Sequence, residues 1–498
     1  MNQKIILYKI TTYVHYLIAL LLFLLIIFSF IFLTYLGVFF LLFFYLFNFY
    51  YLFEILFSDF NYQQKRWWII ILLILPGTGA YLYFIFAKIS FRQLNLSKKL
   101  PIIKNGQDIN DQFSLISSKI ENLELDSNFF MIRDSIREID NFIFDLKNAK
   151  KEICFFLSDL DYGIVWQKLK NELSLKVKEK NLSIYFIVDF FALNKNNQKI
   201  IKEIKLIKNC KIFYFNNWKI FDSLRIKKLR GNLNFIIIDN KITYFNGINL
   251  LEKKFLFAKD GFVFANGFKF KDNLTIFFNY LFNYFVSFFD LKLSEKLNHE
   301  ILNSEKLKEI KINQNNQQEN IQFFVNGLNR NNDFYYKNFI DSIKKAQKSI
   351  NIIIPNLLIL NDFKDCLIDA LNKNIEVKCI ISETNNKNLK SKLSRLYEEE
   401  LITFGAKIFK LENIKTTENM LLIDNKYLLF STSNSSYKSI FNNLNLNLVI
   451  RSEKTIKNVN AFFEDLLKNS YKETTNYLHW SIFKQLFYKF IAFIFPIL

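Results

Sequence analysis

The chain has 498 residues, is 51% hydrophobic with 59 phenylalanines, and carries a formal net charge of +20. That length suits about three domains of ordinary size. The charge suggests an anionic partner such as a membrane surface or a nucleic acid. It is weak evidence for either, because Lys, Asn, Ile and Phe are abundant together while Arg is scarce, a bias that an AT-rich genome produces without selection for binding.

The cysteines exclude two classes of protein. They form no CxxC pair and no Cys/His cluster, and they stand at Cys154, Cys210, Cys366 and Cys379. A zinc site and a disulfide framework are therefore not expected, and the thiols are interpreted as reduced and cytosolic. No metal and no other cofactor is predicted.

The N-terminal 90 residues are interpreted as a membrane anchor. Val14–Phe57 is apolar apart from His15 and Glu54. As one helix this run would be about 66 Å long, against a hydrocarbon core of about 30 Å. Two spans that meet near Thr34–Gly37 fit better. The run is also too long for a cleaved signal peptide and lacks a small-residue cleavage site.

A further span is expected at Trp67–Phe86, after a short polar loop at Ser58–Arg66. Pro76, Gly77 and Gly79 interrupt its helix, and its aromatic residues suit the membrane interface. We therefore expect three transmembrane segments, or two if part of the first run is re-entrant.

Basic residues directly after the last span indicate the orientation. They are Lys88, Arg92, Lys98, Lys99 and Lys104. Under the positive-inside rule they favour a multi-pass protein of the cell membrane with its soluble body in the cytoplasm. With three spans, Lys65 and Arg66 would lie on the opposite face, and the bias would be slight.

The soluble body is organised around a repeated phrase. Asn234–Asn249 reads NFIIIDNKITYFNGIN, and Asn419–Asn434, about 185 residues later, reads NMLLIDNKYLLFSTSN. Three pairs of matching segments precede the two phrases in the same order, and they include helix exits that lead into buried strands. These pairs are 143–156 with 343–354, 180–189 with 373–382, and 209–216 with 405–413. The sequence therefore predicts two duplicated α/β units of about 180 residues, each alternating strand and helix around its own sheet.

The expected organisation follows from these segments. The ranges are a membrane anchor at 1–90, a connector at 91–137, a first unit at 138–290, a linker at 291–322, a second unit at 323–475 and an amphipathic tail at 476–498. Leu274–Phe289 is apolar but short for a span and contains Asn279 and Asn283, so it is expected to pack on the first unit. The tail from Trp480 suits a buried amphipathic helix and an interfacial membrane helix equally well.

Polar residues recur at matching places in the two phrases. Asp239 and Asp424 each precede Asn-Lys, where a tight hairpin turn is expected, and a turn residue is favoured over a catalyst there. Asn249 and Asn434 stand at strand exits. Arg230, just before the first phrase, is a weak candidate for binding phosphate and is interpreted as a surface charge.

Over nearly its whole length the chain resembles bacterial cardiolipin synthases of the phospholipase D superfamily. The resemblance rests on the Trp67 segment with PGTGAYLY, both α/β units, the spacing of the two phrases, Arg451 after LNLNLVI, and the C-terminal ending. In that family each unit carries H-x-K-x-x-x-x-D, followed ten residues after the Asp by an Asn. The resemblance implies two units, each a mixed sheet flanked by helices, that meet across a pseudo-twofold axis and build one site.

Other residues stand at the motif positions of this chain. The His and Lys positions hold Asn232 and Asn234 in the first copy and Thr417 and Asn419 in the second. The Asp and Asn positions are kept, as Asp239 with Asn249 and as Asp424 with Asn434. The three histidines of the chain, at positions 15, 299 and 479, lie away from both motifs.

The resemblance implies a phosphatidyltransferase that joins two phosphatidylglycerols. One histidine would attack the phosphorus, the other would protonate the glycerol leaving group, and cations would cradle the negative phosphodiester. With both imidazoles and both lysines replaced, the favoured hypothesis is a catalytically silent paralogue that binds anionic phospholipid or regulates an active homologue. The alternatives are an active synthase whose site a partner chain completes, and a phospholipase D-type nuclease, which the membrane segments disfavour.

Overall fold

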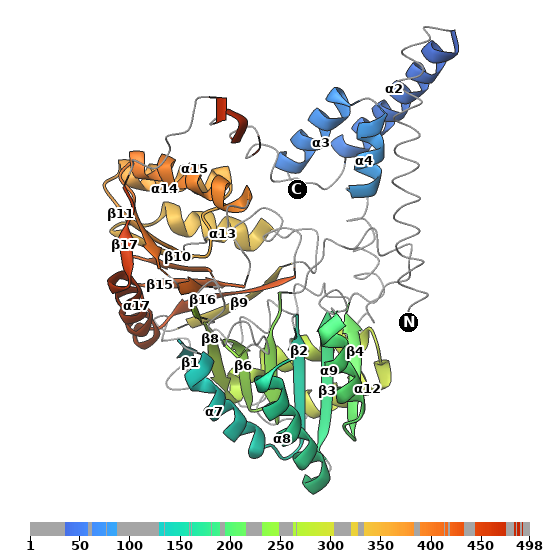
Figure 1. Ribbon diagram of the computed structural model, residues 1–498, viewed down its shortest axis with the longest axis vertical. Helices are drawn as coiled ribbons and strands as arrows, with labels where there is room; N and C mark the ends of the chain where they lie inside the picture. Colours follow the sequence, from blue (N-terminus) through green and yellow to red (C-terminus); the bar gives the residue numbers. More distant parts are fainter. Residues whose placement is uncertain are drawn as a thin grey trace. The chain divides into compact units, whose positions relative to one another are not determined.

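The computed structural model describes residues 35–57, 62–75, 77–86, 129–133, 135–158, 160, 162–180, 182–189, 195–215, 232–248, 262–264, 266–302, 320–326, 333–382, 389–412, 414–416, 419–432, 444–474, 483–484, 486–488 and 491. The chain divides into two compact units. One holds the helices of the N-terminal region, and the other holds two sheets and the helices around them (Figure 1).

The first sheet of the larger unit has seven strands in the order β1-β8-β6-β5-β2-β3-β4. Strands β2, β3 and β4 are parallel, and the other neighbours are antiparallel. The bounds are β1 Phe129–Ile132, β2 Glu152–Leu157, β3 Ser183–Asp189, β4 Cys210–Phe215, β5 Phe235–Ile238, β6 Ile242–Asn246 and β8 Gly267–Lys271.

The second sheet repeats this order and adds one strand at its edge. Its order is β9-β16-β15-β14-β10-β11-β12-β17, so each strand of the first sheet has a counterpart with the same neighbours. The bounds are β9 Asn320–Asn326, β10 Ser349–Ile354, β11 Glu376–Ser382, β12 Lys407–Leu411, β14 Asn419–Ile423, β15 Tyr427–Ser431, β16 Asn445–Arg451 and β17 Ser470–Lys472. The predicted duplication is confirmed, because two separate parts of the chain form sheets of one topology.

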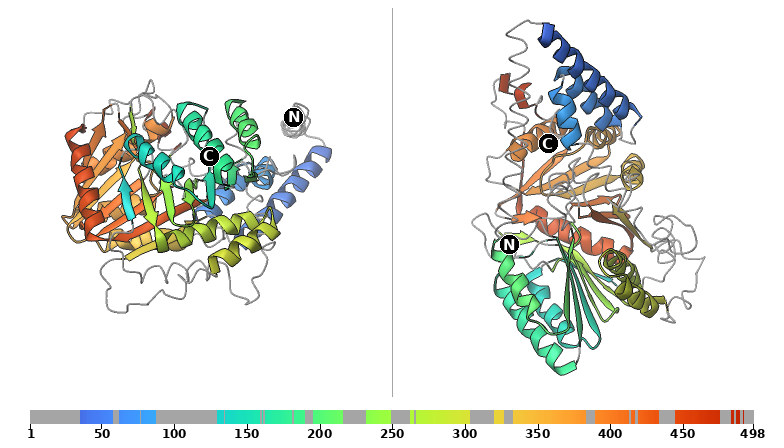
Figure 2. Two further views of the ribbon diagram at one scale, coloured as in Figure 1. Left: turned by 90° about the horizontal axis from the view of Figure 1, so that it is seen from below. Right: turned by 90° about the vertical axis from the view of Figure 1, so that its right-hand side faces the viewer.

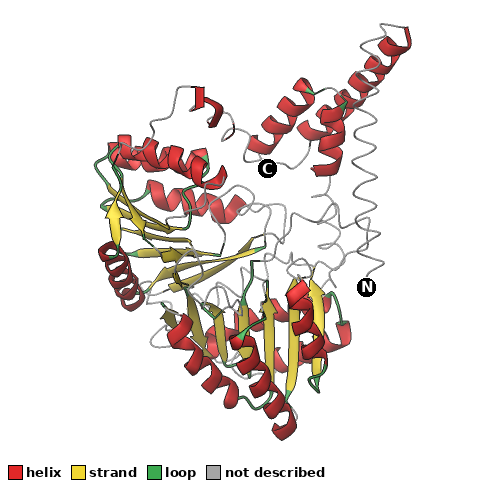
Figure 3. Ribbon diagram, in the orientation of Figure 1, coloured by secondary structure: helices red, strands yellow, loops and turns green. Residues whose placement is uncertain are grey.

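Each sheet has its own layer of helices on one face (Figure 3). These are α7 Ser135–Lys147, α8 Ile164–Lys180 and α9 Lys195–Lys205 on the first sheet, and α13 Asp333–Lys344, α14 Asn361–Asn372 and α15 Leu389–Thr403 on the second. Strand β2 shows why its sequence is a continuous apolar run. Phe155 packs toward Trp166 and the outer helices, while Phe156 packs on the opposite face, so both faces of this strand are buried.

The inner faces of the two sheets share one hydrophobic core with a second set of helices. These are α11 Thr275–Ser287, α12 Leu291–Leu302 and α17 Glu453–Lys468. Phe277 of α11 stacks on Phe323 of β9 with ring centroids 4.4 Å apart, and Phe268 of β8 lies 5.1 Å from Phe430 of β15. Helix α17, orange-red in Figure 2, contacts β1 of the first sheet as well as β12 and β16 of the second. The two halves are therefore joined through their interiors.

The position of α11 confirms that Leu274–Phe289 is a packed helix, and it packs on both halves. The expected unit boundaries differ from the structure. The connector at 91–137 contains β1 and the start of α7, and the linker at 291–322 contains α12 and the start of β9. Strand β1 is short and β9 begins in a polar stretch of sequence, so hydrophobic periodicity alone did not predict either edge strand.

The smaller unit contains α2 Tyr35–Leu56, α3 Tyr62–Ile74 and α4 Thr78–Phe86. The rings of Trp68 on α3 and Tyr83 on α4 lie 5.4 Å apart, whereas fifteen residues of continuous helix would separate them by about 22 Å. The expectation of one span over Trp67–Phe86 is therefore wrong, since this segment folds back on itself. Among the described residues, no helix is both long enough and apolar enough to cross a membrane. Most of the first expected span, before residue 35, and most of the tail at 476–498 lie outside the described residues.

We predict that Phe277→Ala destabilises the protein by about 3–5 kcal/mol, because it leaves a cavity in the core shared by both sheets. Phe277 is fully buried. The measurement is the denaturant midpoint of the full chain in detergent. Phe144→Ala on the exposed face of α7 is the matched control, and we expect a change of less than about 0.5 kcal/mol there. Equal effects of the two substitutions would contradict the shared core.

Candidate functional site

Asn232, at the first motif position, joins the two halves. It lies three residues before β5, and its backbone N–H donates to the carbonyl of Leu444 at 2.8 Å. Its side-chain Nδ2 donates to Oδ1 of Asn445 on β16 at 3.0 Å. The amide side chain at this position therefore forms a hydrogen bond between the two halves.

Asn234 is held within its own half. Its Oδ1 accepts hydrogen bonds from the backbone N–H and the hydroxyl of Ser158, at 2.9 and 3.0 Å. Ser158 directly follows β2. In the second half the strand register places Pro355 at the position that corresponds to Ser158, as Asn419 corresponds to Asn234. Proline has neither an N–H nor a hydroxyl, so Asn419 lacks this arrangement.

The second junction between the halves is a pair of short parallel strands. Strand β7 (Phe262–Phe264) of the first half pairs with β13 (Ile414–Thr416) of the second half. Thr416 is buried, and its backbone N–H donates to the Ser382 hydroxyl at 2.8 Å. This pair is therefore a second contact between the two halves, and in the sequence it ends directly before the second motif copy.

Four of the predicted site residues lie outside the described residues. They are Arg230, Asn249, Thr417 and Asn434. The structure therefore brings together Asn232 with Asn445 and Asn234 with Ser158, and it places Asn419 at the start of β14.

Asp239 lies at the opposite end of β5 from Asn234, about 16 Å along the strand direction. Its carboxylate accepts three backbone hydrogen bonds at the start of β2, from Lys150 and Lys151 at 2.7 Å and from Glu152 at 3.1 Å. Its φ of 51° and that of Asn240, 56°, form the turn into β6. The hairpin turn predicted from Asp-Asn-Lys is confirmed, and the carboxylate also fixes the start of a neighbouring strand.

Asp424 repeats this arrangement in the second half. Its carboxylate accepts hydrogen bonds from the backbone N–H groups of Gln347, Lys348 and Ser349 at 2.6 to 3.1 Å. Burial alone would raise the pKa of Asp424, but these three donors outweigh it and hold the pKa below its usual 3.8. Both carboxylates therefore cap the start of a neighbouring strand through backbone hydrogen bonds.

Sequence reasoning missed Asn445 and its neighbour Asn447. Both are fully buried, and Asn447 accepts a hydrogen bond from the Ser431 hydroxyl. The sequence LNLNL carried a signal, since alternation places both amides on one face of a strand whose other face is leucine. A buried amide needs a partner, and these partners come from distant segments.

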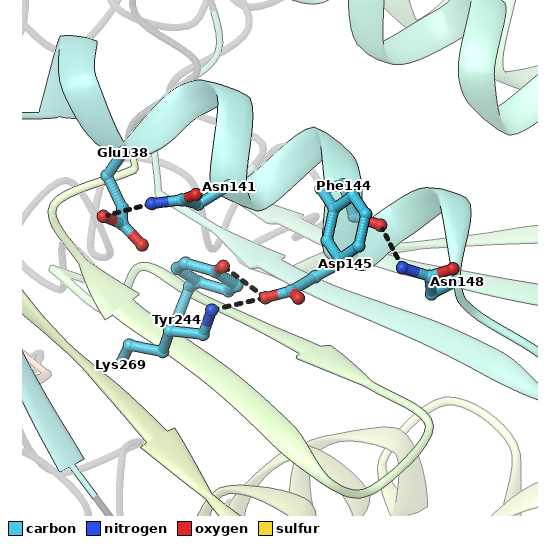
Figure 4. Close-up of polar contacts among 7 residues, drawn as sticks. All are labelled: Glu138, Asn141, Phe144, Asp145, Asn148, Tyr244 and Lys269. Carbon is cyan, nitrogen blue, oxygen red and sulfur yellow. Dashed lines mark hydrogen bonds and ion pairs between the residues drawn. The ribbon is translucent and has the colours of Figure 1, made fainter.

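A separate polar cluster lies between α7 and the first sheet (Figure 4). The Asp145 carboxylate accepts a hydrogen bond from the Tyr244 hydroxyl and pairs with the Lys269 ammonium at 2.6 Å. Burial and the hydrogen bond to Asp145 raise the pKa of Tyr244. The corresponding positions of the second half are Leu429 and Val449, which pack in an apolar core. This cluster therefore anchors α7 by polar contacts in one half only.

Comparisons with known proteins agree with the duplicated fold. The family model "Cardiolipin synthase, PLD-like domain" matches residues 339–467. Cardiolipin synthase A of Buchnera aphidicola is 21% identical over 485 residues, covering 88% of this chain and 94% of that protein. Cardiolipin synthase of Clostridium perfringens is 22% identical over 431 residues, covering 81% and 88%.

Among solved structures, phosphatidylserine synthase of Haemophilus influenzae superimposes with a TM-score of 0.55. The two chains are 12% identical, and the match covers 78% of this chain and 98% of that one, so it shows the fold alone. The duplicated fold and the sequence matches together make the chain similar to proteins of the phospholipase D superfamily. Within that superfamily the chain is cardiolipin synthase-like.

We predict that Asp424→Asn lowers stability by about 1–3 kcal/mol at pH 7, because a charged acceptor of three backbone donors is lost. The folded-state pKa is depressed, so this stabilisation is present above about pH 4 and is lost as the pH falls through the folded pKa. The denaturant midpoints of the wild type and the variant, measured at pH 7 and at pH 3, give the loss of stability and its dependence on pH. Asp465→Asn, whose side chain is exposed, is the control and should change little. A stability difference between wild type and variant that stays constant down to pH 3 would contradict the depressed pKa of Asp424.

We also predict that Lys269→Met destabilises the fold by about 3 kcal/mol, since it leaves the mostly buried Asp145 without its cation. The denaturant midpoint at pH 7 measures this loss. Lys211→Met removes an exposed pair with Asp290 and should cost less than about 1 kcal/mol. Similar losses for the two variants would refute a special role for the cluster.

Proposed function

We propose that this protein is a catalytically silent, cardiolipin synthase-like membrane protein. It binds anionic phospholipid such as phosphatidylglycerol or cardiolipin, or it acts as a regulatory or structural subunit beside an active homologue. One observation carries the proposal: the positions that hold histidine and lysine in the family motif are Asn232, Asn234, Thr417 and Asn419.

The chemistry of phosphodiester transfer explains why these replacements matter. The reaction needs a nucleophile at phosphorus, an acid for the leaving group and cations for the phosphoryl oxygens. A neutral carboxamide supplies none of the three, and the Thr417 hydroxyl would need a general base to act as a nucleophile. In a protease triad, removal of the nucleophile alone lowers the rate by about a million-fold. Here both imidazoles and both ammonium groups are replaced together.

The contacts of the described motif residues support the same conclusion. The Asn232 side chain bonds Asn445 across the junction, and Asn234 accepts two hydrogen bonds from Ser158. Amides in such contacts stabilise the junction and the end of β2. Asp239 and Asp424 are likewise engaged with backbone N–H groups. All four residues therefore have structural partners that account for their presence.

Exposed apolar side chains support the membrane location. On α2 they include Phe43, Leu46, Phe49 and Phe53, which are each more than half exposed. Contiguous apolar surface of this kind marks an interaction site or contact with lipid. The cationic chain, with a net charge of +20, is compatible with an anionic leaflet.

A second candidate is an active cardiolipin synthase that completes its site with a partner chain. It is favoured by the duplicated scaffold, which is retained around both motif copies. Co-expression with an intact homologue separates the two proposals. A rise in cardiolipin above that of the homologue alone, abolished by mutating this chain's motif positions, would favour the active form.

We predict that the purified protein in phosphatidylglycerol vesicles forms no cardiolipin above a vesicle blank. Mass spectrometry of cardiolipin and released glycerol measures this. Cardiolipin synthase of Clostridium perfringens, assayed in parallel, is the positive control. Turnover clearly above the blank that persists in an Asn232→Ala/Thr417→Ala variant would come from a contaminant. Turnover that this variant abolishes would overturn the proposal.

A further inference from the structure

We propose that α3 and α4 form a re-entrant hairpin, which enters and leaves the membrane on one side with its turn in the hydrocarbon core. The ligand of this surface is the acyl-chain region of the bilayer. The inference rests on the membrane location in the proposed function, and it replaces the single span expected from the sequence.

The lengths of the two helices set the first limit. Helix α3 has 13 residues and α4 has 9, so they are about 20 and 14 Å long, against about 30 Å of hydrocarbon. The two helices pack on one another and on α2. The Tyr83 ring lies 5.4 Å from Trp68 and 5.2 Å from Tyr51, and all three side chains are buried. Neither helix reaches the far side of a bilayer, and the contacts return the chain toward its starting point.

The two ends of the hairpin differ in polarity. At the turn, Leu73, Ile74 and Leu75 are 67%, 70% and 43% exposed. At the open end, the first turns of α3 carry Gln63, Gln64, Lys65 and Arg66, and the sequence reaches Lys88 two residues after α4. Lys65 Nζ also donates to the Leu56 carbonyl at the end of α2, at 2.9 Å. The apolar turn suits the hydrocarbon core, and the basic open end of the hairpin suits the lipid head groups.

A buried hydrogen bond satisfies the backbone at the turn. In a continuous helix the Leu72 carbonyl would accept from the N–H of residue 76, but proline has no N–H. Asn48 of α2 supplies the missing donor, with Nδ2 at 2.9 Å from the Leu72 oxygen. Water would satisfy an exposed carbonyl, whereas in hydrocarbon an unsatisfied one is costly. An internal donor at this point is what a turn surrounded by lipid requires.

Two glycines make the reversal possible. Gly77 has a φ of 79°, which favours glycine, and it reverses the chain between the helices. A Cβ at Gly79 would lie 2.7 Å from the Ile71 carbonyl oxygen. The close contact between α3 and α4 therefore depends on the absence of a side chain there.

The test is the sidedness of single cysteines in the full-length protein, in a background with the four native cysteines replaced. Arg66→Cys reports the start of the hairpin and Lys88→Cys its end. Leu206→Cys, at an exposed position on the larger unit, is the reference for sidedness. A membrane-impermeant maleimide is applied to sealed right-side-out and inside-out vesicles. We expect positions 66 and 88 to be labelled from the same side, at least tenfold more than from the other.

Ile74→Cys and Leu73→Cys test the tip, so that misfolding of one variant does not decide the result. We expect both to resist the aqueous maleimide from either side and to react once detergent is added. Labelling of positions 66 and 88 from opposite sides would overturn the hairpin and leave the membrane location intact. Release of the protein by an alkaline carbonate wash would instead overturn both. Aqueous labelling of both tip cysteines in intact vesicles would place the turn outside the hydrocarbon and also refute the hairpin.

Discussion

The packing of two sheet faces onto one phenylalanine-rich core is the contact on which the larger unit depends. Phe268 and Phe430 come from different halves and lie edge to face, and Phe277 of α11 stacks on Phe323 across the same boundary. Burial of large aromatic side chains contributes most of the available hydrophobic stabilisation at such a boundary. Exposure of this surface to water would be costly, so the contact between the halves at Asn232 forms together with the core.

Because the shared core supplies most of the stability, the fold can tolerate the replacement of residues that form hydrogen bonds at the junction. The Asn232–Asn445 contact and the β7–β13 pair lie at the margin of a large apolar interface. Their contribution is small beside the burial of the core, since a typical hydrogen bond stabilises by about 1 kcal/mol net. The residue types at the junction are therefore set by catalysis or by their local hydrogen-bond partners, and only slightly by the stability of the larger unit.

Much of the larger unit could be predicted from the sequence. Buried strands such as β2 and β10 are short apolar runs, and the Asp-Asn-Lys turns recur with them, so the alternation of strands and helices along the chain and the duplication followed from local patterns. The edge strand β1 and the Asn232–Asn445 bond could not be predicted, because both depend on partners more than one hundred residues away. The α3–α4 reversal was missed for a related reason. Pro76 and the glycines indicated an interruption, but hydropathy does not distinguish a kinked helix from two packed ones.

The carboxylates of Asp239 and Asp424 each bind the first backbone N–H groups of a strand in the centre of their sheet. This contact joins two segments more than seventy residues apart in sequence and sets where the strand begins relative to its neighbour. An aspartate with this task serves the architecture in both halves of this chain, and it can do so whether or not the other end of its strand performs chemistry. A search for working enzymes among related chains that relied on this aspartate would therefore recognise the architecture and remain blind to activity.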